Sequence, residues 1–370
     1  MVNTISLNDG LKRHEALMHE LQFRDKIKSA EYHYAIGFEF DGFFDESTIV
    51  NEFFEKIRFL SHEFDFETFK LGITWPIDTG DAEKAHLKLA IQTKLIEMIG
   101  KNLSKKIISS SPDLIFLIDF PKKLVLVRMN PVYVRGKYCK YTRDIAQTEF
   151  FCNKCRGRGC WYCQDTGHFS KESVEQLLSN TFLPFFDSKL LIMHGAGRED
   201  MDVLMLGKGR PFIAELLLPV KRSANLKKIE EQINNGCKGK ISISNLEFCS
   251  LGDVSTLKDT HHDKIYAALV GADKEADFSK LVVGQKMDVV QSTPTRVEKR
   301  RAILNRNKEV TILRVGEITK KEFVVVIKTS HGTYVKEFIS GDNNKTKPSV
   351  SSLTGASCTC KLLDVLEICE

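Results

Sequence analysis

One glycine-rich segment of the chain places charged residues on tight backbone. Three acids and three bases lie within the stretch GREDMDVLMLGKGRPF at residues 197–212, soon after the apolar run at 190–193. Gly195 and Gly197 permit positive φ angles and let another backbone or a base approach closely. A carboxylate that is partly removed from water needs a cation to stay ionised, and an ionised aspartate can act as a nucleophile or a base. The segment therefore contains a candidate catalytic carboxylate, although surface loops tolerate such clusters as well.

Four cysteines form a second candidate site. They are Cys152, Cys155, Cys160 and Cys163. Each C-x2-C pair makes the tight turn that tetrahedral zinc prefers. Gly157 and Gly159 let the chain reverse within the linker, which is shorter than in most two-pair sites. Four free thiols and two half-sites are the alternatives, but the double spacing in an intracellular chain favours zinc. Four protein ligands leave no position for water, so we expect a structural ion.

Composition is typical of an intracellular protein. With 370 residues and 42% apolar content, the chain can bury two ordinary cores and a small accessory module. Residues 1–21 lack the continuous apolar run of a signal peptide, and no run approaches the ~20 residues that cross a bilayer. Ten cysteines without secretory features indicate a reducing compartment. We therefore expect a cytoplasmic protein without a membrane segment.

Positive charge gathers in one stretch, although the net charge is only +5. Residues 121–160 hold ten Lys and Arg residues against Asp144 and Glu149. Such a stripe attracts phosphate backbones. A solvated positive face is the alternative, and for one such run alone it is the favoured interpretation.

The apolar patterns predict an α+β protein in three parts. Before residue 150 they indicate helices, strands and a hairpin, at 11–30, 34–40, 45–60, 68–75, 81–103, 114–120 and 124–129. After residue 172 they indicate helices at 172–182 and 226–235, with a helix or turn from 334. The later strands are expected near 190 and at 213–220, 240–250, 286–290, 310–315 and 323–329. The segments 252–263 and 340–351 have the composition of loops. We expect domains at 1–150 and 168–370, with a cysteine module at 151–167.

Several separated motifs resemble one family, the archaeal and eukaryotic tRNA pseudouridine synthases numbered ten, in their archaeal form. The motifs are PVYVRGKY (131–138) with Gln147-Thr148, CNKCRGRGCWYC (152–163), ESVEQLL (172–178), GREDMDVLMLGKGRPF (197–212), KIYAAL (264–269), QSTPTRV (291–297) with Arg300-Arg301, GTYVKEF (332–338), Gly341-Asp342 and KTKP (345–348). The resemblance covers most of residues 112–370 and is weak before about 110. It implies a pseudouridine synthase domain with a mixed, mostly antiparallel central sheet, preceded by a THUMP-containing RNA-binding domain.

The resemblance also implies roles for individual residues. The catalytic aspartate of the G-R-x-D motif falls on Asp200, the active-site tyrosine on Tyr266 and its basic partner on Lys336. Apolar pocket residues fall on Val335 and Leu363. An arginine that helps to displace the target nucleotide falls on Arg198. We expect Asp202 to face the other way, because successive side chains alternate in an extended segment.

The implied reaction converts uridine to pseudouridine at T-loop positions 54 and/or 55 of tRNA. It breaks the N1–C1′ bond, turns the uracil and rejoins it through C5, so it needs an ionised carboxylate and no organic cofactor. The target must leave its stack, and base flipping is therefore expected. Tyr266 can stack on the uracil and help to remove the C5 proton. The basic stripe and Arg296, Arg300 and Arg301 would hold the tRNA backbone, and we expect a monomer.

Ordinary structural roles compete with these assignments. Tyr266 could be a core tyrosine and Lys336 a solvated lysine, but their occurrence among six motifs in family order argues for the site. For Trp161, packing beside the metal is favoured over stacking on a base. The pair His261-His262 is expected to be solvent-exposed, and Cys358-x-Cys360 to reflect strand alternation.

Two other functions compete with the isomerase. A non-catalytic tRNA chaperone or RNA-processing adaptor could use the same scaffold, although intact Asp200, Tyr266 and Lys336 argue against it. A methyltransferase or thiolase linked to a THUMP domain would need a nucleotide-binding loop, and the sequence holds no G-x-G-x-x-G after a strand and no P-loop.

Overall fold

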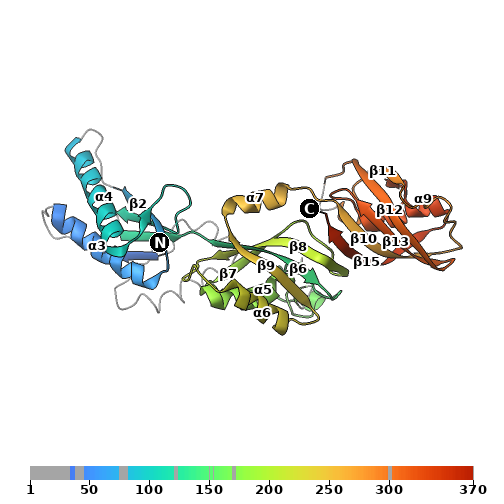
Figure 1. Ribbon diagram of the computed structural model, residues 1–370, viewed down its shortest axis with the longest axis horizontal. Helices are drawn as coiled ribbons and strands as arrows, with labels where there is room; N and C mark the ends of the chain where they lie inside the picture. The colour runs from blue at the N-terminus through green and yellow to red at the C-terminus, as the bar shows by residue number, and fades with distance from the viewer. Residues whose placement is uncertain are drawn as a thin grey trace. The chain divides into compact units, whose positions relative to one another are not determined.

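The chain forms two compact units, which we describe separately (Figure 1). The computed structural model describes residues 34–37, 46–74, 82–120, 124–149, 151–152, 154–168, 172–298 and 302–369. Unit 1 comprises Met1–Val132, Phe182–Leu191 and Glu215–Ala224, and unit 2 comprises Tyr133–Thr181, Ile192–Ala214 and Asn225–Glu370. The domain limits expected at residues 150 and 167 stay a prediction. The helix expected at 11–30 lies outside the described residues.

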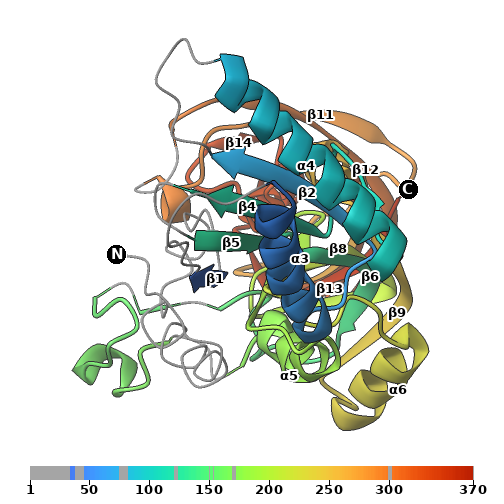
Figure 2. The same ribbon diagram turned by 90° about the vertical axis from the view of Figure 1, so that its left-hand side faces the viewer.

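Unit 1 is a five-stranded sheet with two helices on one face. Its strands, in the order β1-β5-β4-β2-β3, are β1 (Tyr34–Gly37), β5 (Leu124–Met129), β4 (Leu114–Asp119), β2 (Thr68–Thr74) and β3 (Lys106–Ile107). The helices α3 (Glu46–Glu63) and α4 (Ala82–Leu103) lie side by side across the sheet (Figure 2). Phe53, Phe69 and Phe116 are fully buried between them. The predicted hairpin is confirmed, because β4 and β5 pair antiparallel. A THUMP identity stays a proposal.

Unit 2 is built on a ten-stranded, mostly antiparallel sheet, as the resemblance implied. Nine strands follow in spatial order: β14 (Thr346–Lys347), β11 (Lys286–Gln291), β12 (Arg306–Thr319), β13 (Glu322–Thr329), β10 (Lys264–Ala272), β15 (Cys358–Ile368), β8 (Val203–Leu217), β6 (Val132–Lys140) and β9 (Ile241–Cys249). The tenth, β7 (Leu190–Gly195), pairs with β8. Strand β15 pairs antiparallel with β10 but parallel with β8, so it connects the two halves of the sheet.

Helices and two short 3-10 turns complete unit 2. They are η1 (Trp161–Cys163), α5 (Val174–Phe186), α6 (Leu226–Gly236), α7 (Leu251–Asp259), η2 (Thr295–Val297), α8 (Val335–Ser340) and α9 (Val350–Thr354). Helix α6 packs its buried residues Ile229 and Ile233 toward β9, which it precedes (Figure 1). Among the described helices, none combines the length and apolar character that a bilayer span requires.

Two predicted loops are regular structure. The segment 252–263 was expected to be a loop, but α7 begins there because Ser250 and Asp253 form a reciprocal capping box. The polar segment 340–351 contains β14 and the start of α9, whose N-cap is Ser349. The expected strand at 213–220 is the end of β8, which begins ten residues earlier at Val203. The sequence pattern did not predict this earlier part of β8, because closely spaced glycines such as Gly207 and Gly209 are typical of loops. Both adopt positive φ angles within the strand.

The packing of β8 against β15 depends on Gly207. Its φ is +64°, and a Cβ atom there would stand 2.0 Å from the Leu366 carbonyl oxygen. We expect Gly207→Ala to lower the free energy of unfolding by about 3 kcal/mol or more, because backbone must move. The matched control is Gly284→Ala, at φ +83° with no atom within 4 Å of the added Cβ. This control should lower the free energy of unfolding by only about 1 kcal/mol, which is the cost of left-handed backbone for alanine. Equal losses in urea titrations of the two variants would show that the close approach is unimportant.

Candidate active site and metal centre

The loop between β7 and β8, residues 196–202, is anchored by a buried ion pair. Glu199 Oε2 lies 2.8 Å from Arg210 Nε, and each side chain is only 1% exposed. The Tyr138 hydroxyl donates to Glu199 at 2.8 Å, and Gln147 Nε2 donates to that hydroxyl at 2.8 Å. Burial and the charge of Glu199 raise the pKa of Tyr138 well above its usual value, so it remains a donor. Arg210 also donates to the Ala196 carbonyl oxygen at 2.7 Å, which fixes the loop at its start.

A buried lysine holds the other end of this loop. The Lys140 side chain is fully buried, and its Nζ donates to the carbonyl oxygens of Met201 at 2.7 Å and Ile145 at 2.8 Å. Burial lowers the pKa of Lys140, and the negative charges of Glu199 and Asp202 oppose that shift. The backbone then turns, with the Val203 amide donating to the Asp200 carbonyl oxygen at 3.1 Å. The Asp200 side chain is thus presented on a turn whose backbone is held from both ends.

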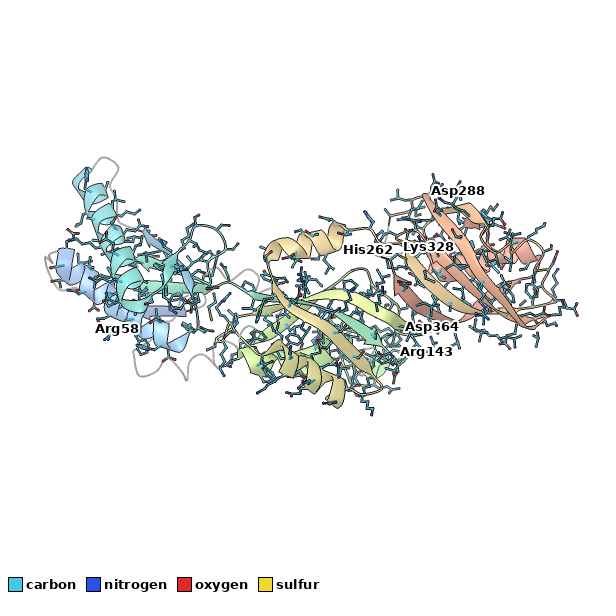
Figure 3. The ribbon with its side chains drawn as sticks, viewed as in Figure 1. Arg58, Arg143, His262, Asp288, Lys328 and Asp364 are labelled. Atoms are coloured by element: carbon cyan, nitrogen blue, oxygen red, sulfur yellow. The ribbon has the colours of Figure 1, made fainter. Side chains whose placement is uncertain are left out.

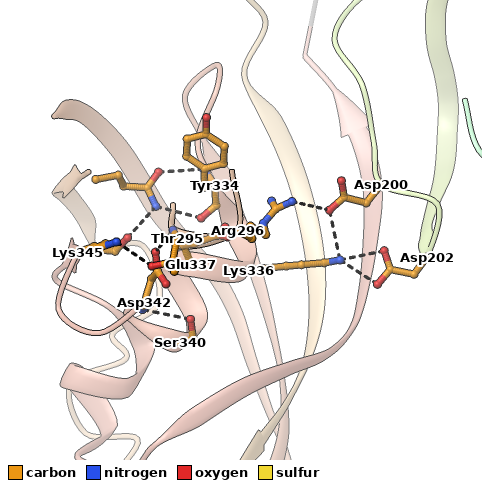
Figure 4. Close-up of polar contacts among 12 residues, drawn as sticks. Asp200, Asp202, Thr295, Arg296, Tyr334, Lys336, Glu337, Ser340, Asp342 and Lys345 are labelled. Atoms are coloured by element: carbon orange, nitrogen blue, oxygen red, sulfur yellow. Dashed lines mark hydrogen bonds and ion pairs between the residues drawn. The ribbon is translucent and has the colours of Figure 1, made fainter. Parts of the chain in front are cut away.

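Two cationic side chains lie next to the Asp200 carboxylate (Figure 4). Lys336 Nζ, from α8, and Arg296 Nη1, from η2, each lie 3.3 Å from Asp200 Oδ2. Arg296 is oriented by Glu337, which accepts from its Nε at 2.6 Å. Burial lowers the pKa of Lys336, but its bonds and charge interactions with Asp202 and Asp200 outweigh this and raise it. Lys336 or Arg198 was expected to supply a cation for Asp200, and the structure brings Lys336 to it. Asp200 itself is 45% exposed and accessible to a ligand.

The expectation that Asp202 faces away from Asp200 is wrong. Both oxygens of Asp202 accept from Lys336 Nζ, at 2.9 and 2.8 Å, which is closer than Asp200 (Figure 4). Alternation of side chains holds for extended backbone, whereas residues 200–203 form a turn. Burial raises the pKa of Asp202, but the Lys336 hydrogen bond and charge prevail and lower it. Two carboxylates therefore share one ammonium.

Tyr266 lies in the middle of the sheet, within electrostatic reach of Arg210, Glu199 and Asp200. It belongs to β10, opposite Ile327 of β13 and Val365 of β15. Burial raises the pKa of its hydroxyl, the positive charge of Arg210 opposes this, and the charges of Glu199 and Asp200 add to the rise. The phenol is therefore neutral near pH 7. The expected pocket residues Val335 and Leu363 are 5% and 6% exposed, on α8 and β15.

The remaining expected RNA contacts are placed differently. Arg198 is exposed at the start of the loop, whereas Arg300 and Arg301 lie outside the described residues. The basic stripe at 121–160 is not one solvated face. Its Lys140 is buried, and Arg143 donates to the Leu363 carbonyl oxygen and pairs with Asp364 at 2.5 Å (Figure 3). The charge count along the sequence failed here because it does not separate internal ion pairs from free surface cations.

The histidine pair is only partly exposed. His261 is exposed but packs edge-on against His331, with ring centroids 4.4 Å apart. His262 is half-buried, and its Nδ1 lies 3.0 Å from the Cys369 carbonyl oxygen.

Sequence reasoning missed the supporting residues of the site. Tyr138, Gln147 and Arg210 all stand in the quoted motifs, but no role was assigned to them. Lys264 begins β10, only 7% exposed, and its Nζ is 3.5 Å from where a Cβ on Gly197 would stand. Burial and the nearby Arg210 lower the pKa of Lys264 to about 8. For Arg210 and Lys264, the signal that could have found them is a charged residue at an inward-facing position of a strand.

The cysteine cluster fits a tetrahedral metal ion. The four sulfurs lie within 4.8 Å of one another, and three Sγ–Sγ separations are 3.7, 3.7 and 3.9 Å. Zn–S bonds of about 2.3 Å require sulfurs about 3.8 Å apart in a tetrahedron. Backbone amides of Cys160 and Gly167 donate to Cys163 Sγ, as a thiolate ligand favours. Gly157 and Gly159 have positive φ angles, as expected for the short reversal. The cluster can therefore hold a metal ion.

The expectation that Trp161 packs beside this cluster is wrong. Its side chain is 78% exposed. The 3-10 turn η1 directs Cys163 inward and leaves Trp161 and Tyr162 on the surface.

The burial of Lys264 generates a prediction about stability. A lysine whose folded pKa is about 8 is penalised while it is charged, and this penalty disappears as pH rises from about 8 to its unfolded pKa of about 10.4. We expect Lys264→Met to raise Tm at pH 7, with the gain over the parent shrinking between pH 8 and 10. The control is Lys328→Met. The Lys328 side chain is 43% exposed and lies 3.2 Å from Asp263, whose carboxylate raises the pKa of the lysine. A gain in Tm that stays constant with pH would contradict the assignment.

Comparison with known proteins identifies the family. The family model described as Pus10, C-terminal, matches residues 133–369. The chain is 37% identical over 320 residues to the tRNA pseudouridine synthase Pus10 of Methanocaldococcus jannaschii, covering 84% of this chain and 70% of the relative. It is 33% identical over 350 residues to the protein of the same name from Methanosphaera stadtmanae, covering 88% and 86%. Among solved structures, a Cbf5–Nop10–Gar1 complex is similar at a TM-score of 0.30 and 12% identity, over 52% of this chain and 44% of that one.

The solved structure is too distant to support an argument, whereas the sequence matches cover nearly the whole of unit 2 and most of both relatives. The chain belongs to the Pus10 family of tRNA pseudouridine synthases.

Proposed function

We propose that this isomerase forms pseudouridine at T-loop position 54, position 55 or both in tRNA, with Asp200 as its catalytic carboxylate. The observation that carries the proposal is the meeting of Asp200 with Lys336 and Arg296, each at 3.3 Å, on a turn whose backbone is anchored by buried charges. The relatives named tRNA pseudouridine synthase support the substrate class. The T-loop position follows from the family resemblance.

The geometry suits an ionised carboxylate. The reaction breaks the N1–C1′ bond and forms a C5–C1′ bond, while a proton leaves C5 and N1 gains one, so no oxidant or organic cofactor is consumed. Asp200 can attack the base, attack the sugar or remove a sugar proton, and each route needs its negative charge. Lys336 and Arg296 favour that charge when a nucleotide covers the site, because ion pairs strengthen as water leaves.

Other residues would bind and position the uridine. Tyr266 is neutral and its pKa responds to the charge of Asp200, which supports a role in which its ring stacks on the uracil and its hydroxyl takes part in proton transfer at C5. Val335 and Leu363 offer apolar contacts. Arg198 is exposed on the same loop and suited to displacing the target nucleotide from its stack. Arg296, Arg300 and Arg301 are proposed to contact the backbone phosphates, and a THUMP-containing domain before residue 150 would bind more distant parts of the tRNA.

We propose zinc as the ion of the cysteine cluster. Four thiolates at tetrahedral spacing are the ligands of structural zinc, and they leave no position for a reacting water. The ion would fix the loop 152–163 and take no part in the isomerisation.

The two aspartates should differ sharply in function. We expect Asp200→Asn to lower single-turnover conversion of a tRNA transcript by at least about 10³-fold, because the nucleophile or base is lost without a change of shape. The matched control Asp202→Asn removes the other carboxylate on Lys336 and should stay within about 10-fold of the parent, because an exposed ion pair contributes little. Pseudouridine is mapped chemically at nucleotide resolution.

The opposite ranking of the two variants would show that Asp202 is the catalytic group. Tight tRNA binding without any pseudouridine, at any position, would favour the non-catalytic adaptor.

The cluster should retain zinc through purification. We expect about one zinc ion per chain by elemental analysis, and loss of that ion in Cys155→Ser. The control Cys360→Ser removes a half-buried thiol of β15 outside the cluster and should keep the ion. Iron in place of zinc, or metal retained by Cys155→Ser, would contradict the proposal.

A further inference from the structure

The metal module carries an exposed aromatic pair that the proposed reaction does not use. Trp161 is 78% exposed and Tyr162 is 47% exposed, on the short turn between Cys160 and Cys163. Their rings stand nearly perpendicular, at 80°, with centroids 5.8 Å apart. A largely exposed tryptophan loses most of the free energy that its burial would contribute, so a binding role is the natural explanation of its position.

A lysine covers one side of this pair. Lys154 Nζ lies 4.3 Å from the Trp161 ring centroid and 4.1 Å from that of Tyr162. Such cation–π contacts hold the ammonium against the rings. Because Lys154 takes one face of the indole while most of Trp161 remains exposed, an open ring surface is left beside a fixed positive charge.

The surrounding charge is complementary to phosphate. The segment 152–168 contains three cations, all exposed, and a single carboxylate, Asp165. The cations are Lys154, Arg156 and Arg158. None of them forms an ion pair with a carboxylate among the described residues. Lys140 and Arg143 differ, because Lys140 donates to the Met201 carbonyl oxygen and Arg143 pairs with Asp364.

Backbone hydrogen bonds hold the turn that carries Trp161. The Cys163 amide donates to the Cys160 carbonyl oxygen at 3.1 Å, and the Asp165 amide donates to the same oxygen at 2.9 Å. These bonds fix the backbone on both sides of Trp161. A preformed aromatic surface loses little conformational entropy when a ligand stacks on it.

We propose that Trp161 is a stacking platform for an unpaired nucleobase of the RNA substrate, with Lys154 and Arg156 binding the adjacent phosphates. Aromatic rings interleaved with cations are how proteins hold single-stranded nucleic acid, because every base has a π face. An apolar peptide would not require the three cations. The inference rests on the proposed function, since it takes RNA as the ligand, but it assigns a second contact that is separate from Asp200.

The fluorescence of Trp161 can test this directly. The chain has two tryptophans, Trp75 and Trp161, so Trp75→Phe leaves Trp161 as the single indole. We expect a tRNA transcript and an oligouridine to quench its fluorescence, in a saturable way that weakens as salt rises. Absence of quenching by RNA that the same protein binds and converts would overturn the inference. Quenching by peptides but not by RNA would overturn it as well.

Affinity measurements provide the second test. We expect Trp161→Ala to raise the Kd for the transcript by about 5- to 100-fold, the loss of one stacked base. Trp161→Phe keeps an aromatic face and should stay within about 3-fold of the parent. Phe248→Ala, which removes an exposed aromatic of β9 away from every proposed RNA contact, should have no effect. An unchanged Kd in Trp161→Ala with normal metal content would contradict the platform.

Kinetics separate this inference from the proposed function. At saturating RNA, Trp161→Ala should convert the transcript at the parental rate, with only KM raised. Asp200→Asn in the Trp75→Phe background should keep the quenching and lose the conversion. Quenching without conversion in the parent would refute the isomerase and leave the platform intact, whereas conversion without quenching would do the reverse.

Discussion

The buried ion pair between Glu199 and Arg210 is the constraint on which the site depends. Neither charge could be buried alone, because an unpaired ion loses its hydration without compensation. Tyr138 and Gln147 provide the additional hydrogen bonds that such a pair needs. The pair therefore fixes one conformation of the loop 196–202. Since Glu199 is directed inward, its neighbour Asp200 is presented outward, where a substrate can reach it.

The cluster around Asp200 combines this buried support with partly exposed charges. Asp200, Asp202 and Glu337 share Lys336 and Arg296, so three carboxylates face two cations. With Asp200 45% exposed, these interactions are screened by water in the free protein. A flipped nucleotide would exclude that water and strengthen the pairs on Asp200. The buried pair of Glu199 and Arg210 therefore positions Asp200, whereas the strength of the partly exposed ion pairs on Asp200 would change when a substrate binds.

The sequence predicted which residue types meet at this site better than it predicted their geometry. The motif around Asp200 and the spacing of the cysteines identify reactive groups, because those groups are specified by residue type. The helix α3, the hairpin of β4 and β5 and the helix α6 were predicted from periodicity and caps. The orientation of Asp202 was not, since a turn replaced the extended backbone. Strand β15 was missed, apart from the alternation of Cys358 and Cys360, because it pairs on both sides and its apolar pattern is irregular.

Charge along the sequence also proved a poor guide to which cations lie free at the surface. Of the ten cations between residues 121 and 160, Lys140 supports the Asp200 turn and Arg143 ties β15 to the same loop through the Asp202 carbonyl oxygen. An internal cation cannot release counterions from a phosphate backbone without breaking its own contacts. The exposed Lys154, Arg156 and Arg158 of the cysteine module (151–167) form no ion pair with a carboxylate among the described residues, and Lys154 Nζ lies 4.3 Å from the ring centroid of the exposed Trp161. The module therefore presents positive charge and aromatic surface together, as the proposed contact with RNA requires.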